Sequence, residues 1–518
     1  MRGPCMARYH GYPAPDPEEP IEPEAVDAAR KSADPPAARA VATQPACRGP
    51  VPAGWPGRHD DRPAGQGEAG MTARTRRGDI VVTRLPNGLT VILREMRQAP
   101  VVSVWCWYRV GSRDERPGIT GISHWVEHMN FKGTRRIHKE DVTRQVELAG
   151  GTWNGYTWLD VTAYFETVQS DAFEEMLRLE ASRMTECLYS QNEVEHERTV
   201  VISELQGGEN DPRSYLEKEV TGTALQAHPY RWPTIGYLSD LRAITRDDLY
   251  GHYRRYYVPN NGILVATGDF ETAAALRLVR RHFGGIRRGE DPPPVRTIEP
   301  PQSGERRLTI RRPSGAVYLE FAFHAPAASE QEFAVFLVAD GILAGGPTVN
   351  LWSGQDGRGP SKTSRLYRSL IEGDLASQVS TLLVPTRHPY LYRVGVTVNE
   401  GVDPGRIEET LTAEIGRLAQ GDIEERDLTR AKNQFLARHA LESESTTDAA
   451  HQLGFFETVA VHRLFLDLPR RVRAVTAGEV ATLARARLDG DRRTVGVLFP
   501  SGPQPAPAAP GGHGVSRP

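Results

Sequence analysis

The chain has 518 residues, and at about 150 residues per domain this length predicts two to four domains. Its 63 Lys and Arg against 66 Asp and Glu give a formal net charge of −3, so it lacks the basic excess typical of a nucleic-acid-binding protein. We see no run of about 18 apolar residues, so we expect no membrane span.

The four cysteines do not predict a disulfide framework. Cys5 and Cys47 lie in a polar tail, and Cys106 and Cys187 lie in apolar surroundings that predict buried thiols. The first thirty residues carry acids and prolines where a secretory signal needs an apolar core. We therefore predict a cytoplasmic location.

Both ends of the chain differ in composition from the middle. Residues 1–77 are rich in Pro, Ala, Gly and Arg and have no apolar periodicity, so we predict that they are disordered. A mis-called start codon is an alternative, because Met71 stands just before sequence typical of a folded domain. Residues 501–518 return to the same composition, and we predict a disordered tail there too.

Residues 78–285 begin with a predicted β-hairpin, because two alternating stretches flank Pro86-Asn87-Gly88. Further on, Asp171 and Glu174 predict the N-terminal cap of a helix. The other predicted elements are strands over 101–110, 152–156, 161–167 and 260–269 and helices over 119–131, 139–148 and 192–206.

Residues 286–306 are predicted to form a linker, because they contain Pro292–Pro294 and a further pair of prolines among charged residues. After it, the order of elements restarts in residues 307–500. The predicted strands cover 307–311, 317–324, 377–384 and 391–398, and the predicted helices cover 330–343, 406–420 and 425–441. This repetition predicts an α+β fold of two homologous domains, each with a mostly antiparallel sheet covered by helices.

The segment that indicates chemistry is His124-Trp-Val-Glu127-His128. Residues four apart on a helix lie on one face, so both imidazoles can point at one metal ion, with Glu127 bordering that face. Two histidines do not complete a catalytic zinc site, which typically has three protein ligands. Glu197 and Glu204 lie seven residues apart and share one face of another predicted helix, which makes this segment the candidate source of the third ligand.

His-x-x-Glu-His followed by Glu-Arg-x-x-Val-x-x-Glu resembles the pitrilysin and mitochondrial-processing-peptidase family of zinc metallopeptidases, the inverzincins. Phe131-Lys-Gly-Thr134, Trp153-Asn-Gly-Tyr-Thr157 and Tyr256-Tyr-Val-Pro-Asn-Asn261 extend the resemblance over roughly residues 78–500. The resemblance is to the bacterial two-domain members. It implies a clamshell of two domains around an enclosed cleft, with residues 78–285 binding zinc and residues 307–500 lacking the metal motif.

The same resemblance implies a role for each candidate residue. His124, His128 and Glu204 would bind zinc, and Glu127 would act as general base on a zinc-activated water in the hydrolysis of peptides or unfolded segments. Glu197 would orient the site from outside the ligand set. Asn154 would contact the peptide substrate.

The sequence departs from the family pattern in its second half. The family usually carries an Arg and a Tyr where this chain has Ile371 and Ser377. Because those side chains are thought to bind substrate or steady the intermediate, we expect a homologous partner subunit in a heterodimer to supply them. A homodimer is the other possible assembly. The glycine-rich segment 344–363 is longer than usual and is predicted to be a loop near the cleft.

Two other readings stay open at this point. One is a non-catalytic subunit that keeps the family fold, as in respiratory complexes. The other is a structural component that binds peptides without cutting them. Damage at the metal-binding positions would favour the first reading, and the five positions named for the metal chemistry are intact. Bound zinc without turnover in the presence of any partner would favour the second.

Overall fold

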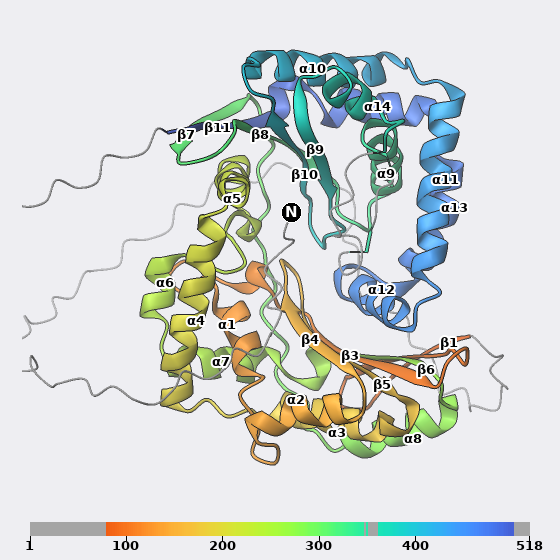
Figure 1. Cartoon of the computed structure of the whole chain (residues 1–518). Helices are drawn as coiled ribbons and strands as arrows, with labels where there is room; N and C mark the ends of the chain where they lie inside the picture. The colour runs from red at the N-terminus through yellow and green to blue at the C-terminus, as the bar shows by residue number, and fades with distance from the viewer. Residues whose placement is uncertain (1–78, 346–348, 351–360, 502–518) are drawn as a thin grey trace, which may run out of the picture. The chain divides into compact units, whose positions relative to one another are not determined.

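The computed structural model describes residues 79–345, 349–350 and 361–501 (Figure 1). The predictions for residues 1–77 and 502–518, and for most of segment 344–363, lie outside the described residues. So do Cys5, Cys47 and Met71. Cys106 and Cys187 are buried free thiols, as predicted.

The first sheet has six strands in the order β1-β2-β6-β3-β5-β4 (Figure 1). They are β1 (Ile80–Arg84), β2 (Thr90–Glu95), β3 (Val101–Tyr108), β4 (Thr152–Thr157), β5 (Thr162–Gln169) and β6 (Gly262–Gly268). β1 and β2 form the predicted hairpin, β2 and β6 run parallel, and the other neighbours are antiparallel. β4 is an edge strand, so one row of its backbone groups pairs with no other strand of the described chain.

The first half of the chain also contains helices α1 to α8. They are α1 (Ile122–Met129), α2 (Lys139–Leu148), α3 (Phe173–Glu186), α4 (Gln191–Glu209), α5 (Pro212–Ala224), α6 (Leu238–Ala243), α7 (Arg246–Tyr256) and α8 (Thr272–Phe283). The prediction that Asp171 caps α3 is wrong. A short 3-10 turn, Ser170–Ala172, takes up the residues after β5, so the cap position falls on Ala172, which makes no side-chain cap.

The second sheet has five strands in the order β7-β11-β8-β10-β9. They are β7 (Arg306–Arg312), β8 (Tyr318–Ala325), β9 (Ala376–Leu383), β10 (Tyr390–Val398) and β11 (Arg493–Pro500). Its helices are α9 (Glu332–Leu343), α10 (Pro404–Gln420), α11 (Glu425–Glu442), α12 (Thr446–Val459), α13 (His462–Ala474) and α14 (Ala477–Arg487). The predicted mixed fold with two sheets is therefore confirmed.

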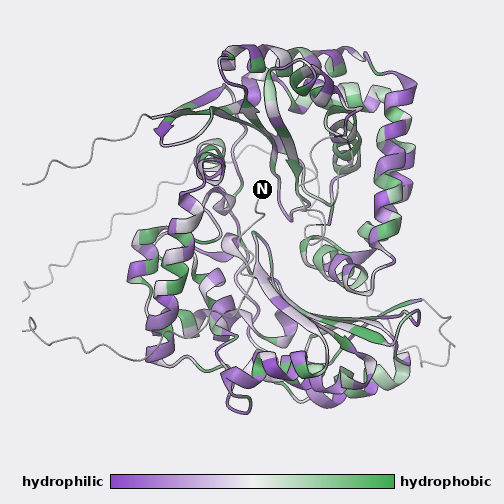
Figure 2. Cartoon of the chain, in the orientation of Figure 1, coloured by the Kyte–Doolittle hydropathy of each residue, from purple (hydrophilic) through white to green (hydrophobic). Residues whose placement is uncertain are grey.

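Hydropathy distinguishes the helices of the second half. α9 is green along most of its length in Figure 2 and is buried at nearly every residue, whereas α11 is mostly purple and buries one stripe. A helix that is apolar all round belongs in a core, and a helix with one apolar stripe belongs at its surface. None of the helices in the described part of the chain combines the length and the apolar composition that a membrane crossing requires.

Each half contributes one helix to the sheet of the other half. α12 packs on β3 and β6, where His451 and Phe455 contact the rings of Trp105 and Trp107. α5 packs on β8 and β11 of the second sheet. The alternate residues of β3 face α3 instead. β3 is therefore buried on both faces, which explains its continuous apolar sequence.

Candidate metal centre

α1 presents both histidines, and its start is fixed by two features. Gly121, at the N-cap, has φ +87°, and a Cβ there would lie 2.3 Å from the carbonyl oxygen of Ile235. The carboxylate of Glu115 accepts hydrogen bonds from the backbone N–H groups of Gly121 and Ser123, each at 2.8 Å. The positive φ and the short distance to Ile235 both exclude a side chain at residue 121. All eight residues of α1 are buried.

The structure brings together His124 and His128 of α1 and Glu204 of α4. Oε2 of Glu204 lies 3.8 Å from Nε2 of His124 and 3.6 Å from Nε2 of His128. Ligands about 2.1 Å from a tetrahedral zinc ion lie about 3.4 Å from one another. Within the described ranges this is the single group of three or more His, Cys, Asp and Glu side chains close enough to hold a metal ion.

The hydrogen-bond partners of the imidazole nitrogens show whether the two histidines are free to bind a metal ion. Nδ1 of His128 is hydrogen-bonded at 2.8 Å to Oε1 of Glu197, which leaves Nε2 directed at the cluster. Nε2 of His128 and both ring nitrogens of His124 are buried without a hydrogen-bond partner in the described chain. Buried polar atoms are rarely left without a partner. The two imidazoles and one carboxylate are a donor set that zinc accepts.

Burial and neighbouring charges shift the pKa values of this group in different directions. Burial, followed by the proximity of His128, lowers the pKa of His124 to about 4, which keeps its imidazole neutral. Burial also acts to lower the pKa of His128, but the hydrogen bond to Glu197 and nearby carboxylates raise it overall. Burial opposes ionisation of Glu197, yet His128 and Lys132 lower its pKa overall. Nζ of Lys132 lies 2.5 Å from Oε2 of Glu197.

Glu127 is buried beside the cluster, between α1 and the edge strand β4. Its Oε2 accepts a hydrogen bond from Oγ1 of Thr157 at 2.8 Å. Burial raises the pKa of Glu127 to about 7 in the absence of a cation. A bound cation would favour the ionised carboxylate and lower that pKa.

The remaining predicted site residues lie apart from this cluster. Asn154 is half-buried on β4, and its Oδ1 accepts a hydrogen bond from the N–H of Gly155 at 2.8 Å. Ile371 ends a single π-helical turn and packs against the core, and Ser377 is exposed on the edge strand β9. Neither Ile371 nor Ser377 offers the charge or the phenol of the family pair.

Sequence reasoning missed Thr157 and Lys132. Both belong to segments that carry the family resemblance, but their partners Glu127 and Glu197 lie on other elements. The alternation of β4 was the available signal, since it places Thr157 and Gly155 on the same face of the sheet. It does not reveal which helix covers that face.

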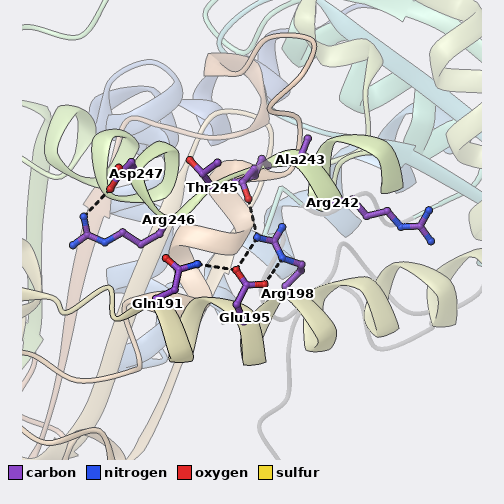
Figure 3. Close-up of a pocket in the computed structure, with 9 residues that line it drawn as sticks. Gln191, Glu195, Arg198, Arg242, Ala243, Thr245, Arg246 and Asp247 are labelled. Carbon is purple, nitrogen blue, oxygen red and sulfur yellow. Dashed lines mark hydrogen bonds and ion pairs between the residues drawn. The ribbon is translucent and has the colours of Figure 1, made fainter. Parts of the chain in front are cut away.

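A surface hollow beside α4 lies apart from the metal-binding cluster (Figure 3). Arg198 lines it, forms an ion pair with Glu195 at 2.9 Å and donates hydrogen bonds to the carbonyl oxygens of Leu241 and Ile244. Its guanidinium also lies 4.7 Å from the centre of the Trp125 ring on α1. Arg198 therefore ties α4 to α6 and to α1, which is a structural role.

Two family models match the chain. The model described as Insulinase (Peptidase family M16) matches residues 90–237, and the model described as Peptidase M16 inactive domain matches residues 243–435. The chain belongs to this pitrilysin-like peptidase family, as its motifs predicted.

Individual relatives agree with this assignment. Zinc protease PqqE of Helicobacter pylori is 27% identical over 374 residues, which is 71% of this chain and 80% of that protein. Subunit 1 of the mitochondrial cytochrome b-c1 complex of Bos taurus is 30% identical over 219 residues, 42% of this chain and 45% of that subunit. The crystal structure of a protease from Helicobacter pylori has the same fold, with a TM-score of 0.76, 23% identity and coverage of 82% of this chain and 100% of that one.

Proposed function

We propose that this chain is a zinc-dependent endopeptidase that hydrolyses peptides or unfolded protein segments. The observation that carries the proposal is the group formed by His124, His128 and Glu204, whose buried imidazole nitrogens point to a metal ion. Relatives named zinc proteases support both the metal and the reaction. Residues 78–285 would form the zinc-binding domain, residues 286–306 the linker and residues 307–500 the second domain.

The residues around the cluster have distinct roles in this proposal. A zinc ion supplies a Lewis acid for the attacking water and for the scissile carbonyl. The Glu127 carboxylate accepts a proton from the water and passes it to the leaving amine. Glu197 holds the Nδ1 proton of His128, so that Nε2 offers its lone pair to the metal, and Lys132 neutralises Glu197.

The edge strand β4 supports a preference for extended substrates. A peptide added alongside β4 would use the row of backbone groups that no other strand of the described chain uses. Asn154 lies on this strand and would contact the peptide near its backbone. Folded proteins do not present such a segment, so peptides and unfolded segments are the expected substrates, within the enclosed cleft that the family resemblance implies.

Ile371 and Ser377 support a requirement for a partner. We infer that a homologous subunit supplies the missing Arg and Tyr. In a heterodimer this would be a second kind of chain, whereas a homodimer would have to supply these groups from other positions. Measurable cleavage by the isolated monomer would contradict this requirement while leaving the peptidase assignment intact.

A non-catalytic subunit or peptide-binding component is the second candidate. The observations that favour it are the changed positions 371 and 377 and the similarity to the cytochrome b-c1 complex subunit, which covers less than half of either chain. The intact metal-binding group favours the peptidase, because a structural subunit has no need of a buried group of unpartnered imidazoles.

The deciding experiment is cleavage of a peptide mixture of varied length, followed by mass spectrometry. The zinc-loaded chain is assayed alone and with its homologous partner, and Glu127→Gln serves as the blank. We expect new peptide ends with the wild-type chain and none with the variant, although both carry zinc. A chain that binds zinc and cleaves nothing under either condition is the non-catalytic component, and a chain without zinc contradicts the metal site itself.

A further inference from the structure

Thr157 is the one side chain of the first sheet that hydrogen-bonds to Glu127 among the described residues. It is the last residue of β4, it is only 1% exposed, and its Oγ1 lies 2.8 Å from Oε2 of Glu127. α1 packs directly against β4 at this point. The proposed general base is therefore held from the strand as well as carried by the helix.

A second hydroxyl fixes the position of the first. Thr157 and Thr162 are directly opposite each other in the β4–β5 ladder, and their Oγ1 atoms lie 3.3 Å apart. Thr162 is fully buried and donates its own proton to the carbonyl oxygen of Val110 at 3.0 Å. Each hydroxyl has one proton to give, so Thr162 has none left for Thr157.

The single proton of Thr157 therefore has two possible acceptors, and the distances decide between them. The Glu127 carboxylate is nearer, at 2.8 Å against 3.3 Å for Thr162. Hydrogen bonds to a charged acceptor are also roughly twice as strong as those between neutral groups. The proton of Thr157 therefore points at Oε2 of Glu127.

We propose that Thr157 is a positioning residue for Glu127, an inference that rests on the proposed peptidase function. The terminal torsion of a glutamate is broad, so a buried carboxylate without this bond would sample several orientations. With Oε2 held by Thr157, Oε1 is the oxygen presented to the proton of the attacking water. Thr157 itself does not touch the metal or the substrate.

The role proposed for Thr157 is separate from holding β4 in place. β4 pairs with β5 through backbone hydrogen bonds that a change of side chain leaves intact. The adjacent Tyr156 faces the opposite side, where its hydroxyl is hydrogen-bonded to Nε2 of His451 at 2.8 Å. Valine at 157 has nearly the same shape as threonine, so Thr157→Val removes the hydroxyl while the strand keeps its other contacts.

The test compares Thr157→Val with Thr157→Ser in the zinc-loaded full chain, under whichever condition, alone or with partner, the wild type cleaves. The probe is a mixture of quenched fluorescent peptides. We expect Thr157→Val to lower kcat about 10- to 100-fold, the usual effect of losing a residue that orients a catalytic group. KM and zinc content should stay unchanged, and Thr157→Ser should restore most of kcat because it keeps the hydroxyl.

Thr267→Val is the matched control. Thr267 is fully buried in the same sheet, but its hydroxyl donates to the carbonyl oxygen of Thr446, away from the metal-binding group. Its loss should leave kcat unchanged. An equal loss of kcat in this variant would mean that any buried hydroxyl of the sheet matters, which would overturn the inference.

A measurement without metal or turnover gives an independent readout. In the metal-free chain, Thr157→Val, Glu127→Ala and the double variant form a double-mutant cycle followed by urea unfolding. Since both single changes remove the same bond, the shift of the unfolding midpoint in the double variant should be smaller than the sum of the single shifts. Additive shifts would overturn the inference.

The remaining outcomes separate this inference from the proposed function. Full activity in Thr157→Val, loss of zinc together with activity, or failure of Thr157→Ser to restore kcat would overturn the role of Thr157 and leave the peptidase standing. A wild-type chain that cleaves nothing, alone or with its partner, would defeat the proposed function and this inference with it.

Discussion

The two sheets of this chain have corresponding strand orders, but within the described residues only the first adjoins a group of side chains that could hold a metal ion. β2, β6, β3, β5 and β4 occupy the positions that β7, β11, β8, β10 and β9 occupy in the second sheet, and the first pair of each series is parallel. The helix after β3 is α1, with its two histidines, and the helix after β8 is α9, which is almost wholly apolar.

The same scaffold forms in the half with the two histidines and in the half without them. In α9 the buried polar residue is Asp340, which accepts a hydrogen bond from Tyr392 at 2.9 Å and belongs to the core. In α1 the buried histidines keep nitrogens that no described group satisfies. The same layered unit therefore folds with or without these side chains, and changing them should alter chemistry before it alters the fold.

The largest expected effect is loss of the metal. His128→Ala removes one proposed ligand and leaves Oε1 of Glu197 without the imidazole that it contacts, so zinc content and peptide cleavage should both fall to background. The fold should persist, which a circular dichroism spectrum like that of the wild type would show. Asp340→Asn is the control in the corresponding helix and should keep full zinc content. Zinc retained by His128→Ala would contradict the assignment of the ligands.

Glu127→Gln should separate metal binding from catalysis. The amide cannot accept and return a proton, and general acid–base catalysis typically contributes about 10²- to 10⁴-fold. We expect kcat to fall by at least this factor while zinc content, measured by mass spectrometry, stays at the wild-type level. A variant that retained more than a tenth of the wild-type kcat would show that Glu127 is not the base.

The exchange of helices between the two halves can be tested at Gly454 of α12. A Cβ at this residue would lie 2.0 Å from Nε1 of Trp107, so a side chain there forces α12 away from β3. Gly454→Val should lower the free energy of unfolding by about 1 to 3 kcal/mol, the usual effect of overpacking, as a urea titration would measure.

Gly416 of α10 is the matched control for this change. Nothing lies within 4 Å of a Cβ at Gly416, so Gly416→Ala should be neutral or stabilising by up to about 1 kcal/mol, because alanine favours a helix over glycine. Destabilisation by Gly416→Ala equal to that of Gly454→Val would mean that replacing any helix glycine costs stability, and that the contact with Trp107 does not account for the loss.

The packing of α5 and α12 on the sheet of the other half explains what the sequence could and could not predict. The hairpin of β1 and β2 and the bounds of α2 follow from local turn and periodicity signals, and both agree with the structure. α5 was missed although Asp211 caps it and Pro212 follows. Its apolar face meets β8 and β11, which are distant in sequence.

The candidate site shows the same limit. Spacing along α1 and α4 was enough to propose the two histidines and the segment that carries Glu197 and Glu204, because positions on one helix face are fixed by helical geometry. The choice of Glu204 as the third ligand came from the family resemblance. The bond from Thr157 to Glu127 depends on how α1 packs against β4, and no spacing encodes that distance. The start of α1 was also misplaced, since the left-handed Gly121 delays the helix to Ile122.

The last expected effect concerns pH and the polar residue of α9. Burial, opposed in part by hydrogen bonds from Thr381 and Tyr392, raises the pKa of Asp340 from 3.8 to about 6. The folded chain therefore holds this proton more tightly than the unfolded chain. Its contribution to stability is fully present below about pH 4 and is lost as the pH rises through 6.

The loss amounts to on the order of 2 to 3 kcal/mol in the free energy of unfolding, at about 1.36 kcal/mol per pH unit. Asp340→Asn has no carboxyl proton to lose at this position. Between pH 4 and 6.5 its free energy of unfolding should therefore decrease by about 2 to 3 kcal/mol less than that of the wild type. Urea titrations across this range compare the two chains. Parallel curves would mean that Asp340 ionises normally in the folded state, and that α9 tolerates a buried charge where the corresponding helix α1 carries the proposed metal ligands His124 and His128.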